Sequence, residues 1–233
     1  MARVARDGSD CRSQPKYRIV SSGTLYRHVC FRALGVVIGV LVASAAFSPQ
    51  AGADATAKPA LTRALQAGGL VLVLRHAATD FSKPDEDPVD LTDCATQRNL
   101  SQQGRADARA IGRGVRRLDL RVSAVLTSAF CRTRETARLA FGRATVTPAL
   151  LNTITAAHDA RGRAQIRAAR RLLGTKPAPG TIKALVTHGV VVSDATGLTL
   201  EEGETLVLRP LGASRFKLLG RILPREWRTL SAV

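Results

Sequence analysis

Two histidines and several arginines in this 233-residue chain directly follow short apolar runs, and these residue types suit phosphate chemistry. Arg75 and His76 follow the first run, Arg132 comes shortly after the second, and His188 follows the third. Histidine can act as a nucleophile or a proton donor near neutral pH. The guanidinium of arginine is a planar fork of donors that matches a tetrahedral oxyanion. The set therefore suits a phosphate monoester, which carries about two negative charges near pH 7.

The three apolar runs are typical of strands buried on both faces of a parallel sheet. They cover residues 70–74, 124–127 and 181–187. The alternation of strands with helices predicts an α/β fold, a three-layer α/β/α sandwich with a mostly parallel central sheet. Ligands of such sheets bind beyond the carboxyl ends of the strands. The histidines and arginines are expected to meet there.

The remaining elements complete this fold. Ser101 is a suitable N-cap for a helix that runs to about Leu118, and Gly142 is a suitable end for the next helix. The full set of further expected elements is a short helix at 61–67, helices at 101–118, 133–141 and 160–173, a short strand at 145–147, and a closing hairpin of 204–209 and 215–222.

The composition excludes several classes of protein. With 45% hydrophobic residues the chain is too apolar to be wholly disordered. The net charge of +17 invites a nucleic-acid interpretation, but few aromatic residues and no nucleic-acid motif accompany it. No Gly-x4-Gly-Lys, His-Glu-x-x-His, Cys-x-x-Cys or Gly-x-Ser-x-Gly motif occurs. The sequence therefore predicts no nucleic-acid partner, no metal and no cofactor.

The first 53 residues are typical of a secretory signal. Seven basic residues precede an apolar run at 33–47, and the small residues Ala51-Gly52-Ala53 follow it, which predicts cleavage after Ala53. The alternative is a membrane anchor, but the run is shorter than the ~20 residues that span a bilayer. We expect a secreted or periplasmic protein that meets the membrane only transiently, with a tail and short helix at 54–67 and one domain at 68–233.

Two cysteines, Cys94 and Cys131, remain after residue 53. Cysteines of an exported protein are more often paired than free. The hypothesis is a disulfide that holds the long polar loop 80–99 over the site, and the alternative is two unpaired thiols.

Four segments, in order along the chain, resemble the histidine phosphatase superfamily, which includes cofactor-dependent phosphoglycerate mutases and many acid phosphatases. Arg75-His76-Ala77 looks like its Arg-His-Gly motif, with Ala77 in the place of glycine. Leu100-Ser101-Gln102-Gln103-Gly104 is similar to its Leu-Thr/Ser-x-x-Gly helix start. Residues 127–137 resemble its Ser-Pro-x-x-Arg-x-x-Gln/Glu-Thr-Ala segment, and residues 186–189 its second-histidine motif. The resemblance covers roughly residues 68–223.

The resemblance implies a role for each matched residue. His76 would attack phosphorus and become a phosphohistidine, with His188 on the other side of the phosphate. Arg75 and Arg132 would bind the phosphate oxygens, whose charge must be neutralised during transfer. A carbonyl or another acceptor should hold the ring nitrogen of His76 that does not attack.

The general acid is where this sequence departs from the family. Many relatives carry a carboxylate in the loop after the third strand, but residues 150–155 read Leu-Leu-Asn-Thr-Ile-Thr. Asp159 and Asp93 are weak candidates, since isolated loop acids are more often simply solvated, and the same holds for Asp80, Asp87 and Asp90. A protein without the acid could still cleave good leaving groups, whereas alkyl phosphates would react slowly.

The predicted function is an exported phosphatase that hydrolyses a small phosphorylated substrate through a phosphohistidine on His76. A phosphomutase of the same superfamily and a non-catalytic phosphate- or anion-binding module are the alternatives. Sugar phosphates, lipopolysaccharide phosphates, nucleotides and phosphoproteins all stay open as substrates.

Overall fold

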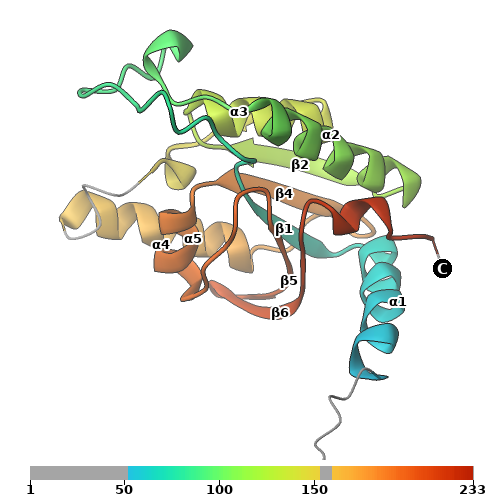
Figure 1. Cartoon of the computed structure of the whole chain (residues 1–233). Helices are drawn as coiled ribbons and strands as arrows, with labels where there is room; N and C mark the ends of the chain where they lie inside the picture. Colours follow the sequence, from blue (N-terminus) through green and yellow to red (C-terminus); the bar gives the residue numbers. More distant parts are fainter. Residues whose placement is uncertain (1–51, 153–158, 233) are drawn as a thin grey trace, which may run out of the picture. The chain divides into compact units, whose positions relative to one another are not determined.

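A computed structural model describes residues 52–152 and 159–232 (Figure 1). Its centre is a six-stranded sheet in the order β3-β2-β4-β1-β5-β6. The neighbours among β3, β2, β4 and β1 pair in parallel, and β5 and β6 add an antiparallel edge. The strands are β1 Leu70–Arg75, β2 Val122–Thr127, β3 Thr145–Val146, β4 Ile182–Thr187, β5 Thr205–Gly212 and β6 Arg215–Ile222. The predicted α/β fold with a mostly parallel sheet is confirmed.

Helices cover both faces of the sheet. They are α1 Gly52–Ala67, α2 Gln102–Arg117, α3 Cys131–Phe141, α4 Ala160–Gly174 and α5 Gly189–Thr196. Successive side chains of a strand point to opposite faces, and β1 shows this directly. Leu70, Leu72 and Leu74 pack in a core cluster with α1, α2 and α3, whereas Val71 and Val73 pack in a second cluster with α4 and α5. The result is the expected three-layer sandwich.

Local signals in the sequence explain where two helices begin and end. The Ser101 hydroxyl accepts a hydrogen bond from the Gly104 N–H at 3.0 Å and caps α2. Gly142 adopts φ 74° at the end of α3, a left-handed conformation that glycine takes without steric cost. Both ends agree with the sequence prediction.

Two helical segments differ from the prediction. Helix α1 begins at Gly52, so residues 54–59, expected to form a tail, are helical. Alanines at 55, 57 and 60 explain this, because alanine has the highest intrinsic helix propensity. The short helix α5, directly after His188, was not predicted; its run of three valines gives no helical pattern.

The basic stretch and apolar run of the predicted leader, residues 3–47, lie outside the described residues. Within residues 52–152 and 159–232, no helix is both long enough and apolar enough to span a membrane.

Candidate active site

A cavity of about 410 Å³ opens beside the carboxyl ends of β1 and β4. Both histidines line this strand-end cavity, together with the arginines Arg75, Arg98 and Arg132. Parallel strands deliver their last residues to the same edge of a sheet, and the register of β1 against β4 pairs Arg75 with Thr187. His76 and His188, one residue further along each strand, therefore become neighbours, with ring centroids 5.6 Å apart.

His76 is held as a neutral ring with one defined tautomer. Its Nδ1 lies 3.0 Å from the carbonyl oxygen of Ala77. A carbonyl can only accept, so Nδ1 carries the hydrogen and Nε2 keeps its lone pair. Burial lowers the pKa of His76 to about 3. The positive charges of Arg132, Arg75 and Arg98 also lower this pKa, whereas the hydrogen bond to Ala77 raises it. The sequence analysis expected an acceptor for the ring nitrogen of His76 that does not attack, and the Ala77 carbonyl is in that place.

His188 is buried beside it and is oriented by a hydroxyl. Its Nε2 lies 2.9 Å from the Ser128 hydroxyl oxygen, which also accepts from the Phe130 N–H. This contact holds the Nε2 side of the ring and leaves Nδ1 on the opposite side. Burial lowers the pKa of His188 well below its usual value. The nearby His76 and the arginines of the site lower this pKa further.

Arg132 is the most deeply buried cation of the site, with 1% of its side chain exposed. Its Nη1 donates to Asp85 Oδ1 at 2.8 Å and to the Arg98 carbonyl at 3.3 Å, and its guanidinium stacks 4.3 Å from the Phe130 ring centroid. Its Nε is buried and has no acceptor in the part of the chain that the structure describes. A buried donor of this kind is costly unless a ligand supplies the acceptor.

Arg75 is fixed by a different loop. Its Nη1 donates to the Leu200 carbonyl at 2.9 Å, and its Nη2 lies 3.5 Å from Glu202 Oε1. The same carboxylate accepts from the Thr79 N–H and hydroxyl and lies 3.8 Å from Nδ1 of His76. Glu202 therefore ties Arg75 and the segment after His76 to the turn before β5. Like Arg132, Arg75 has a buried Nε without an acceptor among the described residues.

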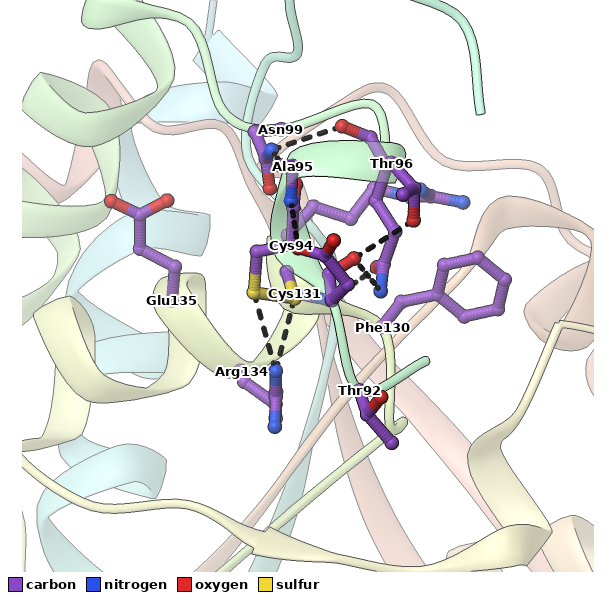
Figure 2. Close-up of a disulfide and its surroundings, with 12 residues drawn as sticks. Thr92, Cys94, Ala95, Thr96, Asn99, Phe130, Cys131, Arg134 and Glu135 are labelled. Carbon is purple, nitrogen blue, oxygen red and sulfur yellow. Dashed lines mark hydrogen bonds between the residues drawn. A yellow bond between two sulfur atoms is a disulfide. The ribbon is translucent and has the colours of Figure 1, made fainter. Parts of the chain in front are cut away.

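A disulfide joins Cys94 to Cys131, the pairing that the sequence predicted, with Cα atoms 5.7 Å apart. Figure 2 shows the two sulfurs with the Arg134 side chain beside them, and Arg134 donates to both. Cys131 is the first residue of α3, and its N–H donates to Gln97 Oε1 at 2.9 Å. The disulfide thus anchors residues 80–99, the disulfide loop, to the helix that carries Arg132.

The disulfide loop brings two charged residues that sequence reasoning did not assign to the site. Asp85 pairs with Arg132 and accepts from the Arg98 N–H at 2.8 Å, and Arg98 lines the strand-end cavity. The one available signal for Arg98 was its place just before the Leu-Ser-x-x-Gly motif. Glu202 carried no signal, because only the fold brings it near His76.

The Arg75-His76-Ala77 motif departs from Arg-His-Gly without backbone strain. Ala77 is buried and is absent from the described non-glycine residues with positive φ, so alanine is compatible with this backbone. The helix-start glycine, by contrast, is required. A Cβ on Gly104 would lie 1.9 Å from the Ala78 carbonyl oxygen, so glycine lets the start of α2 approach the chain after His76.

The weak general-acid candidates do not line the cavity. Asp93 and Asp159 are exposed N-caps that accept from the N–H groups of Ala95 and Gly162. Two other residues that were not singled out do line it: Asn152, and Asp194 on α5. Arg134 contacts the disulfide and does not line the strand-end cavity.

A comparison with protein families finds a match to one segment of the chain. Residues 71–155 match the model of the histidine phosphatase superfamily (branch 1). This segment of the chain is similar to that superfamily. The segment that matches this superfamily holds Arg75, His76 and Arg132, whereas His188 and Glu202 come later in the chain.

Several solved structures resemble this chain. SixA from Agrobacterium tumefaciens is 20% identical, with a TM-score of 0.46 over 67% of this chain and 98% of that chain. The protein histidine phosphatase SixA complexed with tungstate is 16% identical, with a TM-score of 0.46 over 67% and 97%. A mycobacterial glucosyl-3-phosphoglycerate phosphatase is 17% identical, with a TM-score of 0.43 over 64% and 96%. No curated protein matches the chain by sequence.

Proposed function

We propose that this chain is an exported phosphatase that hydrolyses a phosphate monoester through a phosphohistidine on His76. The observation that carries the proposal is one cavity that combines two neutral, buried histidines with buried arginine Nε–H donors that have no acceptor among the described residues. Neutral histidines suit nucleophilic attack, and unpaired arginine donors suit phosphate oxygens.

In the first step Nε2 of His76 forms a bond to phosphorus while the bond to the leaving oxygen breaks. The electron pair of that bond departs with the leaving group. Arg75, Arg98 and Arg132 neutralise the charge on the transferring group, which is where most of the catalytic effect of phosphoryl transfer arises. The Ala77 carbonyl stabilises the ring as its charge develops, because it accepts from Nδ1.

In the second step water attacks the phosphorus of phosphohistidine. The bond between phosphorus and Nε2 breaks, its electron pair returns to the ring, and inorganic phosphate leaves. His188 donates from Nδ1 to a phosphate oxygen during both steps, with Ser128 holding the opposite nitrogen.

Purified protein with 4-nitrophenyl phosphate tests the proposal. We expect release of inorganic phosphate, loss of about 10³-fold or more in kcat/KM for His76→Ala, and a base-stable, acid-labile phosphoenzyme after rapid quenching. Equal rates for the wild type and His76→Ala would contradict it. A substrate with further hydroxyls, such as glycerol phosphate, distinguishes the mutase alternative: phosphorus NMR then shows an isomeric ester for a mutase and free phosphate for a phosphatase.

Export is a separate part of the proposal, supported by the basic stretch, the apolar run and the small residues before Ala53. Expression of the full chain in a bacterium, followed by fractionation and intact mass, tests it. We expect a periplasmic product that starts at Asp54. A cytoplasmic or membrane-bound product that retains residues 1–53 would contradict export with cleavage.

A further inference from the structure

The two ends of the disulfide loop run antiparallel to each other. Thr79 forms an antiparallel bridge with Leu100. The positions of residues that face each other in an antiparallel pair have a constant sum, so this bridge places residue 81 opposite residue 98. Phe81 and Arg98, 17 positions apart in the sequence, are therefore neighbours because of the register between the two ends of the loop.

Arg98 is held both by its backbone and by its side chain. Its N–H donates to Asp85 Oδ1 at 2.8 Å, and its carbonyl accepts from Arg132 Nη1 at 3.3 Å. Its guanidinium carbon lies 4.3 Å from the centroid of the Phe81 ring. The backbone contacts fix the place of Arg98 in the loop, whereas the ring contact involves the charged end of a side chain that lines the strand-end cavity.

The same arrangement occurs at a second arginine of the site. The guanidinium carbon of Arg132 also lies 4.3 Å from a ring centroid, that of Phe130. Stacking uses the flat face of a guanidinium, so the N–H donors stay in its plane and can reach a phosphate oxygen. Arg98 and Arg132 are thus each stacked on a phenylalanine and each line the strand-end cavity.

The two phenylalanines differ in exposure. Phe130 is 6% exposed and its ring also contacts His188, so it has a packing role of its own. Phe81 is 70% exposed and belongs to none of the core clusters formed by the described residues. Since little apolar area of Phe81 is removed from water, its contribution to the site is the contact with Arg98.

On the basis of the proposed function, we propose that Phe81 is a positioning residue whose ring holds the Arg98 guanidinium in place to bind the phosphate group of the substrate. An arginine side chain has several rotatable bonds, and fixing it on binding costs conformational entropy. A ring that already restrains the guanidinium lowers this cost. Phe81 therefore acts on the phosphate through Arg98, and its effect does not depend on the leaving group.

Calorimetric binding of inorganic phosphate to the purified protein tests the proposal. Phe81→Leu keeps an apolar side chain but removes the ring. It should raise the Kd of phosphate about two- to fivefold, the size of an exposed cation–π contact. Phe81→Trp offers a ring on which Arg98 can stack and should retain the wild-type Kd. Leu218→Ala is the control, because it shortens another exposed apolar side chain, on β6, and should leave the Kd unchanged.

A double-variant cycle separates an effect through Arg98 from a direct effect of the ring. Arg98→Ala should raise the Kd about tenfold or more, because a charged donor is lost. In the Arg98→Ala background, Phe81→Leu should have no further effect. An unchanged Kd in Phe81→Leu, shown to be folded by thermal melting, would overturn the inference. An equal effect of Phe81→Leu with and without Arg98 would also overturn it, because the ring would then act without the arginine.

Failure of the proposed function gives a different result, because calorimetry measures phosphate binding without turnover. Equal hydrolysis of 4-nitrophenyl phosphate by the wild type and His76→Ala would remove the phosphatase proposal but not the coupling of Phe81 to Arg98. Hydrolysis that depends on His76, together with an unchanged Kd in Phe81→Leu, would leave the phosphatase proposal intact and remove only the role of Phe81.

Discussion

The two arginines at the strand ends are held in contrasting ways. Arg75 has 27% of its side chain exposed and is held by a carbonyl and by Glu202, whose side chain is 17% exposed. Arg132 is 1% exposed and is held by Asp85 from a loop that a disulfide anchors. A buried cation interacts more strongly with phosphate because water screens it less. We therefore expect Arg132 to bind phosphate more strongly than Arg75, and its partner Asp85 lies on a loop that is linked by the disulfide to Cys131, the residue before Arg132.

The largest expected effect separates the two arginines directly. Arg132→Ala should lower kcat/KM for 4-nitrophenyl phosphate by about 10²–10³-fold, and Arg75→Ala by about tenfold. Steady-state kinetics and thermal melting of both variants measure this. The double variant Arg132→Ala/Asp85→Ala controls for the carboxylate left unpaired. An equal or reversed order would break the comparison.

Removal of the disulfide should destabilise the fold and weaken substrate binding on the side of the site that holds Arg132. Cys94 and Cys131 are 37 residues apart, and a loop of this size corresponds to about 4 kcal/mol of unfolding free energy in the chain-entropy model. Urea unfolding of Cys94→Ala/Cys131→Ala measures it. We also expect a higher KM, because the disulfide loop carries Asp85 and Arg98. A lower stability with an unchanged KM would show that the loop holds these residues without the disulfide.

The two buried histidines predict that stability declines in acid. Both have a lower pKa in the folded than in the unfolded chain, so below about pH 6.5 the unfolded state binds more protons. The free energy of unfolding therefore decreases as the pH decreases, by up to about 1.4 kcal/mol per pH unit for each histidine. For His76 the fall should level off near pH 3, where the folded state also binds the proton.

Urea unfolding between pH 7 and pH 4 measures this slope. His76→Gln and His188→Gln should each remove one histidine's contribution to the pH dependence of the free energy of unfolding. The difference in this free energy between variant and wild type should therefore change as the pH is lowered. A difference that does not depend on pH would show that the histidine is protonated in the folded protein.

The smallest effect concerns Glu202, a positioning residue. Glu202→Gln keeps the shape and the acceptor oxygen but removes the charge beside Arg75 and His76, and should lower kcat/KM about three- to tenfold. Glu202→Gln can be combined with Cys94→Ala/Cys131→Ala. If the Arg75 and Arg132 sides of the site are independent, the effects of the two changes on kcat/KM, expressed as free energies, should add to within about 0.5 kcal/mol. A larger coupling energy would mean that the two halves act as one unit. Replacement by Asp, which restores the charge, should recover part of the loss.

Particular residues show how far the sequence predicted the site. Arg75, His76, Arg132 and His188 were assigned because each stands in a motif next to an apolar run, and all four line the cavity. Arg98 and Glu202 were not assigned, because each is a charged loop residue whose partners lie far away in the sequence. The start of α1 differs from the prediction because the alanine-rich residues before Leu61 show no amphipathic pattern and yet are helical.

The sequence by itself determined the strands and the residues at their ends, because hydrophobic periodicity and short motifs are local properties of the chain. It also determined that residues 150–155 carry an amide and no carboxylate. Only the tertiary structure decided which loops hold the two arginines, and that Asn152 lines the same cavity as both histidines. Such contacts join residues up to 127 positions apart, as between Arg75 and Glu202. They depend on the packing of strands and loops in three dimensions, which local patterns do not encode.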